Sequence, residues 1–293
     1  MPALIAGALA IGTSPILVRL SELPPTATAF WRVALAVPVL YLLSVRFGGS
    51  SMGGGAEARM SVVSSRADRW GLAVAGFFLA VDLACLHWSL RYTSVTNAIL
   101  FLNFAPFFVA FASWGLYREP IGLRFVLGLL VTIGGMTALM GAYGVLNPSL
   151  NSSQFVGDGF GLLAGAFYGG YLMVVARYRC RISTLTVMAV SSAACAVTLF
   201  PVAYLMGERL IPVTGSGVGV LIGLAVITHA GGQGLIAYAL RSLPTPVAAV
   251  TLMLQPIAAG LGAWLVFAEA LSPWQLVGAV VVMVGIVIVR TGT

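Results

Sequence analysis

The sequence has few ionisable or polar side chains that could bind a substrate or transfer a proton, and most of them lie within long apolar runs. Asp82 is the only acidic residue well inside such a run. His229 and Gln233 lie four residues apart, so a helix would place them on one face. Ionisable groups inside a membrane are costly and are functional candidates by default. Asp82 could contact a substrate amine or carry a proton; the alternative is a structural ion pair with Arg32, which would keep Asp82 charged.

Aromatic side chains near these polar residues could line a central cavity and stack on a planar apolar substrate. Asn97 heads a helical stripe that continues through Phe101, Phe104 and Phe108. The alternative is that the aromatic side chains pack internally or face lipid, and that the polar ones bond between helices. The candidate substrate-binding residues are Phe78, Asp82, Asn97, Phe101, Phe104, Tyr168, His229 and Gln233.

Several reaction chemistries are excluded because all 15 basic residues are arginine. Without lysine there is no Walker-type phosphate loop and no Schiff base. The sequence also lacks the HExxH motif, and its three cysteines, Cys85, Cys180 and Cys195, are far apart. We therefore expect no catalytic residue, no metal and no cofactor. An intramembrane enzyme is the alternative from a different class, and the sequence disfavours it.

The composition indicates a membrane protein. Hydrophobic residues make up 60% of the chain, charged residues make up 8%, and the mean hydropathy is +1.03. A soluble domain carries about 25% charged residues. The formal charge of +7 would indicate nucleic acid binding in a soluble protein, but here it fits arginines that face the cytoplasm and anionic lipid. The expected partners are the bilayer and a small molecule, not nucleic acid.

Length and sequence breaks divide the chain into ten apolar runs, each close to the 20 or so residues that a membrane-spanning helix needs. Because backbone groups in hydrocarbon must be paired internally, these runs are predicted to be helices. They cover residues 2–20, 26–46, 70–91, 94–117, 121–142, 158–177, 183–206, 216–240, 245–268 and 272–290.

The arginines predict the orientation. If the N-terminus is cytoplasmic, eleven arginines lie on the cytoplasmic side and three on the other, as the positive-inside rule requires. Both termini are then cytoplasmic. The three are Arg19, Arg91 and Arg209, and the eleven are Arg46, Arg59, Arg66, Arg69, Arg118, Arg124, Arg177, Arg179, Arg181, Arg241 and Arg290.

An internal repeat relates the two halves of the chain. A shift of 150 residues brings ten identities into one register without a gap; Arg91, Pro106, Trp114, Glu119, Gly128 and Gly135 fall on Arg241, Pro256, Trp264, Glu269, Gly278 and Gly285. The repeats are predicted at 1–142 and 158–293, with a linker at 143–157. Since five spans is an odd number, the second repeat would be inverted, an arrangement common in secondary transporters. Pro106 and Pro256 are candidate hinges, and fixed bends are the alternative.

Several of these sequence features resemble those of a known family of membrane proteins. Ten spans in two repeats, the tripeptide Phe30-Trp31-Arg32, and a Trp followed by a Glu and then a Gly-containing helix in each half resemble the drug/metabolite transporter superfamily in its EamA-type branch. Within it, the chain is most similar to aromatic amino acid exporters of the YddG type.

This resemblance implies export of amino acids, aromatic ones included, by alternating access through a bacterial inner membrane. Export of drugs or other metabolites is the alternative within the superfamily. Protons are a candidate coupling ion, with downhill export as the alternative, and the oligomeric state stays open.

Overall fold

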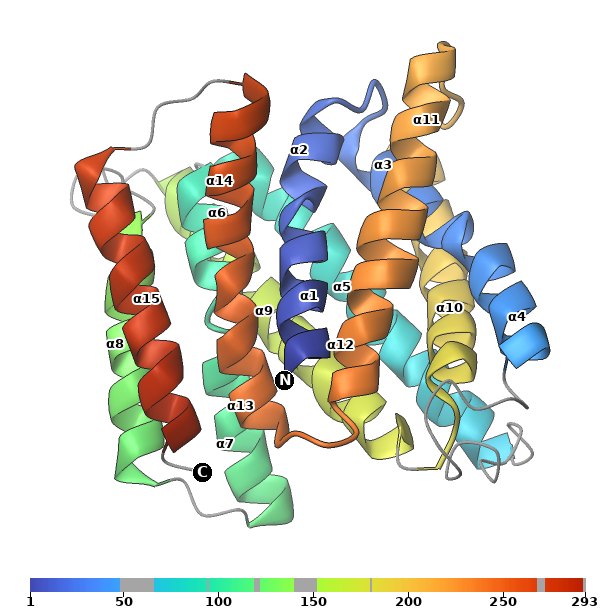
Figure 1. The fold of residues 1–293 in the computed structure, drawn as a ribbon. Helices are drawn as coiled ribbons and strands as arrows, with labels where there is room; N and C mark the ends of the chain where they lie inside the picture. Colours follow the sequence, from blue (N-terminus) through green and yellow to red (C-terminus); the bar gives the residue numbers. More distant parts are fainter. Residues whose placement is uncertain are drawn as a thin grey trace. The chain divides into compact units, whose positions relative to one another are not determined.

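The computed structural model describes residues 1–47, 66–93, 95–118, 122–139, 152–179, 181–267 and 272–291. All regular secondary structure within these ranges is helical (Figure 1). The elements are α1 (Pro2–Gly12), α2 (Ser14–Arg19), α3 (Pro25–Ala34), α4 (Ala36–Phe47), α5 (Arg66–Tyr92), α6 (Val95–Leu102), α7 (Ala105–Tyr117), α8 (Leu123–Leu139), α9 (Ser152–Arg179), α10 (Thr184–Leu205), α11 (Gly215–Gly223), the π-helix η2 (Leu224–Gln233), α12 (Gly234–Ala239), α13 (Thr245–Thr251), the 3-10 helix η3 (Leu252–Leu254), α14 (Gln255–Phe267) and α15 (Pro273–Thr291).

The ten predicted spans are confirmed. Nine helical stretches in the described chain are long and apolar enough to cross a membrane, and the tenth, α8, is apolar over 17 residues. Two helices begin earlier than predicted, α5 at Arg66 and α9 at Ser152. Their polar first turns carry the helix beyond the apolar stretch on which the prediction was based.

Several spans are broken rather than continuous. The span over 94–117 divides into α6 and α7 at Asn103 and Phe104, and the span over 245–268 passes through η3 before α14. Pro106 and Pro256 were expected inside helices, but each is the second residue of a new helix. A proline costs little there because the N–H that it lacks has no partner within the helix anyway. The role of the two prolines as hinges stays a prediction.

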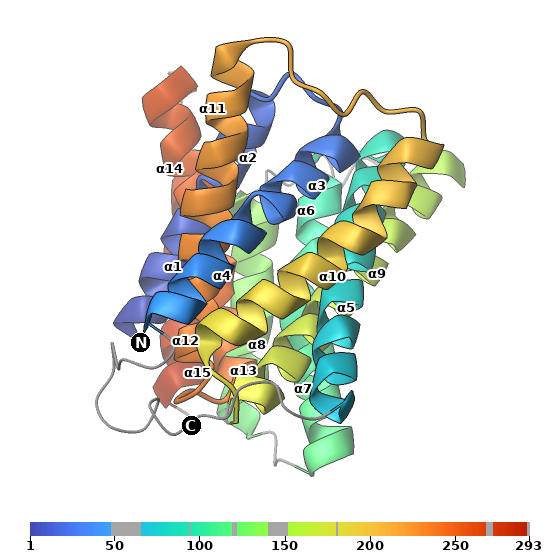
Figure 2. The same ribbon diagram turned by 90° about the vertical axis from the view of Figure 1, so that its right-hand side faces the viewer.

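The helices form two compact units. Unit 1 comprises Met1–Ala80 and Tyr171–Ser242, and unit 2 comprises Val81–Gly170 and Leu243–Thr293. Each unit therefore takes helices from both halves of the sequence. In unit 1, α10 packs against α3 and α4 (Figure 2) and α1 packs against η2 and α12. In unit 2, α8 packs along α15.

The crossing of α8 with α15 shows how the two sequence halves are related (Figure 1). A Cβ on Gly128 would lie 2.8 Å from the carbonyl oxygen of Gly285, and one on Gly135 would lie 2.9 Å from that of Gly278. Residue numbers rise along α8 as they fall along α15, so the two helices are antiparallel. Gly128 corresponds to Gly278 in the repeat, and Gly135 to Gly285, so each glycine contacts the counterpart of the other. This self-complementary pattern is that of a two-fold axis and confirms the inverted repeat.

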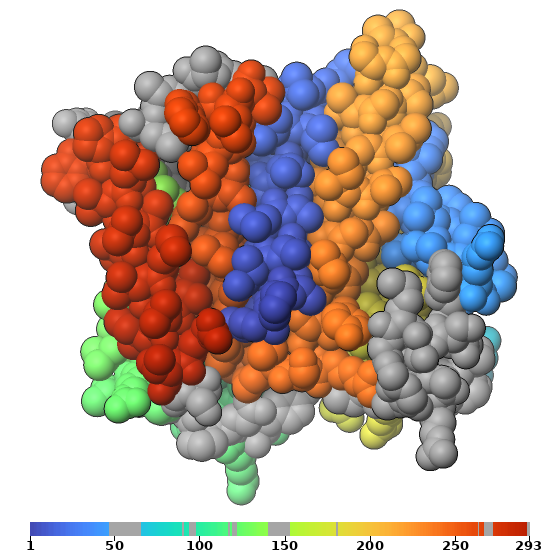
Figure 3. All heavy atoms as spheres, viewed as in Figure 1, coloured from blue at the N-terminus to red at the C-terminus, as the bar shows by residue number. Residues whose placement is uncertain are grey.

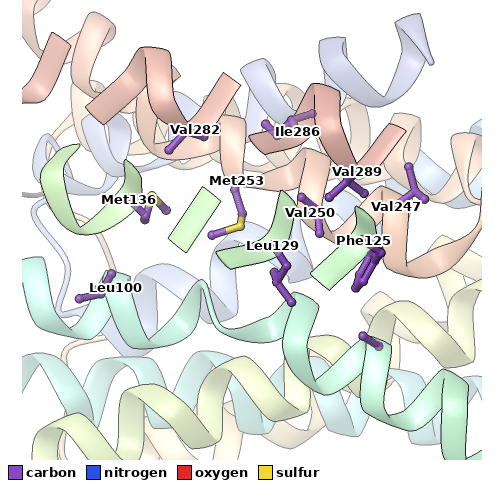
Figure 4. Close-up of a cluster of buried hydrophobic side chains, with 11 residues drawn as sticks. Leu100, Phe125, Leu129, Met136, Val247, Val250, Met253, Val282, Ile286 and Val289 are labelled. Atoms are coloured by element: carbon purple, nitrogen blue, oxygen red, sulfur yellow. The ribbon is translucent and has the colours of Figure 1, made fainter. Parts of the chain in front are cut away.

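Apolar side chains fill the space around this crossing (Figure 4). Lipid is as apolar as these side chains, so helix association in a membrane depends on close van der Waals packing rather than on escape from water. The cluster combines residues of the fourth and fifth spans with residues of the ninth and tenth. Its buried members are Leu100, Ala110, Phe125, Leu129, Met136, Val247, Val250, Met253, Val282, Ile286 and Val289.

Two adjacent glycines on α8 give a direct test of this packing. A Cβ on Gly135 would lie 2.6 Å from the backbone nitrogen of Val282, whereas one on Gly134 would meet nothing within 4 Å. We expect Gly135→Ala to lower the free energy of unfolding by about 1–3 kcal/mol through overpacking. Gly134→Ala should leave it unchanged or raise it, since alanine favours helix. Thermal unfolding of both purified variants in detergent measures the difference, and equal melting temperatures would contradict the close crossing.

In unit 1 a reciprocal clasp joins the segment before α3 to the segment before α11. The Glu208 carboxylate accepts a hydrogen bond from the backbone N–H of Ala27 in the first turn of α3, at 2.6 Å. The Glu22 carboxylate in turn accepts from the hydroxyl of Thr214 at 2.6 Å and from its backbone N–H at 3.1 Å. Thr214 is the N-cap of α11 and accepts from Gly217 N–H at 3.0 Å. Each carboxylate thus lies at the positive end of the other segment's helix, where negative charge is stabilising.

The clasp predicts an acid-dependent loss of stability. Hydrogen bonds from Thr214 are the main cause that lowers the pKa of Glu22 from its ordinary 4.5, and Arg209 adds a smaller effect. The folded state therefore releases this proton more readily than the unfolded state. The stabilisation is complete above pH 4.5 and is lost as the pH falls through the lowered pKa. We expect the melting temperature of the wild type to decline on acidification to about pH 3 more steeply than that of Glu22→Gln; parallel pH profiles would contradict the clasp.

Candidate functional site

Unit 1 contains an arginine within a membrane span. Arg32 lies near the end of α3 and is half-buried, and its Nη1 donates to the hydroxyl of Ser14 at 3.0 Å. Ser14 is the first residue of α2, after the break in the first span at Thr13, and is buried. A permanent charge at this depth is costly, and such groups mark functional sites by default.

A second polar pair joins two elements, α10 and η2, that both pack against α3. His229 of η2 is 1% exposed, and its Nε2 lies 2.7 Å from the hydroxyl of Ser192, a fully buried residue of α10. The two elements that carry Arg32 and His229, α3 and η2, pack against each other. We call Ser14, Arg32, Ser192, His229 and Gln233 the polar cluster, which brings together α2, α3, α10 and η2.

Gln233 completes the polar cluster. It is the last residue of η2 and is 4% exposed, and its Oε1 is buried without a hydrogen-bond partner among the described residues. Leaving a buried acceptor unsatisfied costs about 1–3 kcal/mol. The sequence predicted that His229 and Gln233 share a helix face. The structure keeps them about one turn apart, but in a π-helix, a conformation frequent at functional sites.

A glycine contact fixes where η2 lies relative to α1. A Cβ on Gly7 would lie 2.8 Å from the carbonyl oxygen of Gly232, and a Cβ on Gly232 would lie 2.7 Å from the side chain of Ile11. The surface of α1 accordingly lies beside that of α11 to α12 (Figure 3). Since Ser14 follows Ile11 by less than one turn, this contact holds the start of α2 near the polar face of η2.

The aromatic candidates in unit 2 are only partly brought together. Phe101 and Phe104 stack with ring centroids 6.0 Å apart. The continuous stripe through Phe108 was wrong, because the chain breaks between α6 and α7 at Phe104. Phe104 also packs against the apolar cluster around α8 and α15. The side chain of Asn97, which headed the predicted stripe, lies outside the described residues.

The remaining candidates lie on α5 and α9. Phe78 is half-buried in the unit 1 part of α5, where its ring lies 6.4 Å from that of Phe77. Asp82 is 5% exposed, one turn further along the same face, in the unit 2 part of α5. Tyr168 is half-buried on the unit 2 part of α9. The structure thus groups His229 with Gln233, and Phe101 with Phe104. It leaves Tyr168 on a separate element.

Some polar residues escaped sequence reasoning. Arg179 was counted among the cytoplasmic arginines, but its side chain is fully buried. It donates to the carbonyl oxygens of Ala237 at 3.0 Å and Ile182 at 2.8 Å. The first of these belongs to the last turn of α12, whose carbonyls have no partner within the helix. The sequence did not single out Ser192 either, since a serine in an apolar run is typical of ordinary helix packing.

These features define a class of protein: a helical membrane protein built from an inverted repeat, with a polar cluster buried among its spans. The sequence model of the EamA-like transporter family matches residues 1–141 and again residues 155–291. The chain belongs to the EamA-like transporter family, as the resemblance predicted. It is therefore a transporter and not an enzyme.

Individual relatives are distant. An uncharacterized transporter of Archaeoglobus fulgidus is 25% identical over 274 residues, which cover 92% of this chain and 89% of that protein. The pseudopaline exporter CntI of Pseudomonas aeruginosa is 24% identical over 264 residues, covering 90% and 85%. A protein of known crystal structure superposes with a TM-score of 0.82 at 15% identity, covering 99% of this chain and 95% of that one, and so shares the fold.

Two neighbouring serines on α10 test the polar cluster. Ser191 and Ser192 are both fully buried, but Ser191 donates only to carbonyls of its own helix, whereas Ser192 bonds His229. We expect Ser192→Ala to lower the free energy of unfolding by about 1–3 kcal/mol, because the imidazole loses its partner. Ser191→Ala should change it little. Thermal unfolding in detergent compares them, and a Ser191→Ala variant as unstable as Ser192→Ala would count against a special role for this pair.

Proposed function

We propose that this chain is a secondary transporter that exports amino acids, aromatic ones included. The observation that carries the proposal is the half-buried guanidinium of Arg32, which donates to Ser14 from a helix that packs against α10 and η2, the elements of the Ser192–His229 pair. A guanidinium forms charge-assisted hydrogen bonds with carboxylates, and every amino acid carries a carboxylate. Family membership and a relative named as an exporter support outward transport.

An aromatic substrate has separate support in unit 2. The rings of Phe101 and Phe104 are stacked there, and such surfaces bind planar side chains by further stacking. Phe78, Asp82, Asn97 and Tyr168 remain proposed substrate contacts, as the sequence predicted.

The proposed mechanism is alternating access. Inverted repeats let one fold adopt two related conformations that expose a site to opposite sides. We assign the repeats to 1–142 and 158–293, with 143–157 as the linker, and Pro106 and Pro256 as the hinges. The proposed location is a bacterial inner membrane with both termini cytoplasmic. The arginine distribution supports the orientation, and the resemblance to bacterial exporters supports the choice of membrane.

A second candidate is the export of another small metabolite. It is favoured by the 24% identity to a protein named as a pseudopaline exporter. Export of amino acids and export of another metabolite differ in the substrate, but both would use the same polar cluster.

Efflux from cells that express the chain tests the proposal. We expect cells preloaded with radiolabelled phenylalanine to lose it faster than cells without the chain, and Arg32→Gln to reduce that excess rate about tenfold or more. Arg46→Gln is the matched control, because Arg46 is exposed at the end of α4. Both variants must be present in the membrane in equal amounts. Equal efflux by the wild type and Arg32→Gln would contradict the role of Arg32, and no excess efflux of any amino acid would contradict the proposed substrate.

A further inference from the structure

The eighth span changes its helical winding without a break in the chain. It runs over Gly215–Ala239, and the π-helix η2 occupies Leu224–Gln233 between α11 and α12. Leu224 and Gly234, at the two joins, both have ordinary right-handed helical dihedral angles. Most π-helices are a single turn inserted in an α-helix, and they are frequent at functional sites. A π-helix of ten residues in the middle of a span is therefore a candidate for a segment that changes shape.

The winding decides which residue faces a neighbouring helix. In a π-helix each N–H donates to the carbonyl five residues earlier rather than four, so each turn contains about one residue more than an α-turn. If one turn of η2 closed to α winding, every residue beyond it would shift by one position, about 100° around the axis and about 1.5 Å along it. The place that Gly232 now occupies would then be taken by Gly231.

Two consecutive glycines lie where η2 contacts α1. In the described state Gly232 makes this contact, because a Cβ on it would lie 2.7 Å from the side chain of Ile11 and 3.2 Å from its backbone nitrogen. A Cβ on Gly231 would meet only the carbonyl oxygen of Val226, five residues earlier in η2 itself, at 3.1 Å. Packing against α1 thus accounts for Gly232 but not for Gly231. A shift of one residue would bring Gly231 to α1, where a residue without a Cβ is again required.

The other contacts of this span are compatible with such a shift. Arg179 holds the end of α12 through the carbonyl oxygen of Ala237, and the neighbouring residues offer the same backbone group. The bond between Ser192 and His229 favours the described register. Gln233 opposes that register, because its Oε1 is buried without a hydrogen-bond partner among the described residues, which is unfavourable.

We propose that η2 is a register switch, with a second state of unit 1 in which one turn adopts α winding and Gly231 replaces Gly232 against α1. In that state α12 is turned by about one residue relative to α11. Glycine weakens the preference for α winding, so Gly231, Gly232 and Gly234 keep the α form from dominating. The inference rests on the proposed alternating access, for which it names a segment of unit 1 that changes shape.

Disulfide trapping detects the second state directly. A Cβ on Gly232 would lie 3.3 Å from the Cβ of Ala10, near the roughly 3.8 Å between the Cβ atoms of a disulfide. Ala10→Cys is paired with Gly232→Cys, Gly231→Cys or Ala230→Cys in a full-length chain whose native cysteines are alanine. The pairs are oxidised in native membranes, and cross-linked peptides are identified by mass spectrometry.

The expected pattern distinguishes a switch from a fixed π-helix. The pair with Gly232→Cys reports the described state and the pair with Gly231→Cys reports the second state, so we expect both to cross-link. Ala230→Cys is the control and should not cross-link, because residues one or two positions apart do not share a helix face. A fixed π-helix would cross-link at Gly232→Cys alone.

Gly231→Ala tests whether transport requires the second state. The new methyl group meets no other helix in the described state, so the melting temperature should stay close to that of the wild type. In the second state it would overlap Ile11, and we expect the excess efflux of phenylalanine to fall about tenfold or more, as overpacking of that state implies. Gly234→Ala is the matched control, since a Cβ there meets nothing within 4 Å, and should transport like the wild type.

The two experiments separate the switch from the proposed function. The absence of a cross-link between Ala10→Cys and Gly231→Cys, or equal cross-linking with Ala230→Cys, would overturn the switch, and this result stands even if Gly231→Ala does not fold. Wild-type efflux by folded Gly231→Ala would also overturn it and leave amino acid export standing. Cross-linking at both glycines without excess efflux of any amino acid would support the switch and overturn the proposed substrate instead.

Discussion

The absence of water from the bilayer core is the constraint on which the rest of this structure depends. Backbone groups there must be paired within the chain, which leaves helices as the spanning element. Buried hydroxyls obey the same rule: Thr132, Thr228 and Thr251 each donate to the carbonyl four residues earlier in their own helix. Ser192 differs because it bonds His229 on another element. A polar side chain that bonds across helices, as Ser192 and Arg179 do, links elements that the backbone alone does not join.

The lipid around the spans is as apolar as their side chains. Helix association therefore depends on close van der Waals contact rather than on burial from water. Glycines supply that contact in both units, with Gly7 against Gly232 in unit 1 and the four-glycine crossing of α8 with α15 in unit 2. At this crossing the repeat and the packing depend on the same residues, since Gly128 and Gly135 meet the counterparts of each other. A substitution there would alter both sides of a symmetric contact, which explains why the register of these glycines persists in both halves of the sequence.

The fold could be predicted because a membrane span is a local feature of the sequence, an apolar stretch of known length. The inversion then follows because each repeat has five spans, and an odd number of spans makes the second repeat enter the membrane from the opposite side. The site could be predicted only in part. The pairing of Ser192 with His229 joins residues 37 positions apart, and nothing in the local pattern of either helix signals it. Arg179 stands between Arg177 and Arg181, so it was grouped with the exposed arginines, yet it caps a helix end in the interior. The π-helix was missed because a span is recognised by the length of its apolar stretch, which does not report the number of residues per turn.

An unsatisfied acceptor has a different meaning in a transporter than in a structural protein. The buried Oε1 of Gln233 has no partner among the described residues, which costs about 1–3 kcal/mol; if Gln233 contacts substrate, as the sequence predicted, a donor on the substrate would remove that cost. Such a hydrogen bond would stabilise the substrate-bound state even if the rest of the substrate made few close contacts with the protein. That matters because a carrier must also release its substrate on the far side, and a ligand held by a few polar contacts can leave when a conformational change separates them. A polar cluster of five residues among apolar spans is consistent with this requirement.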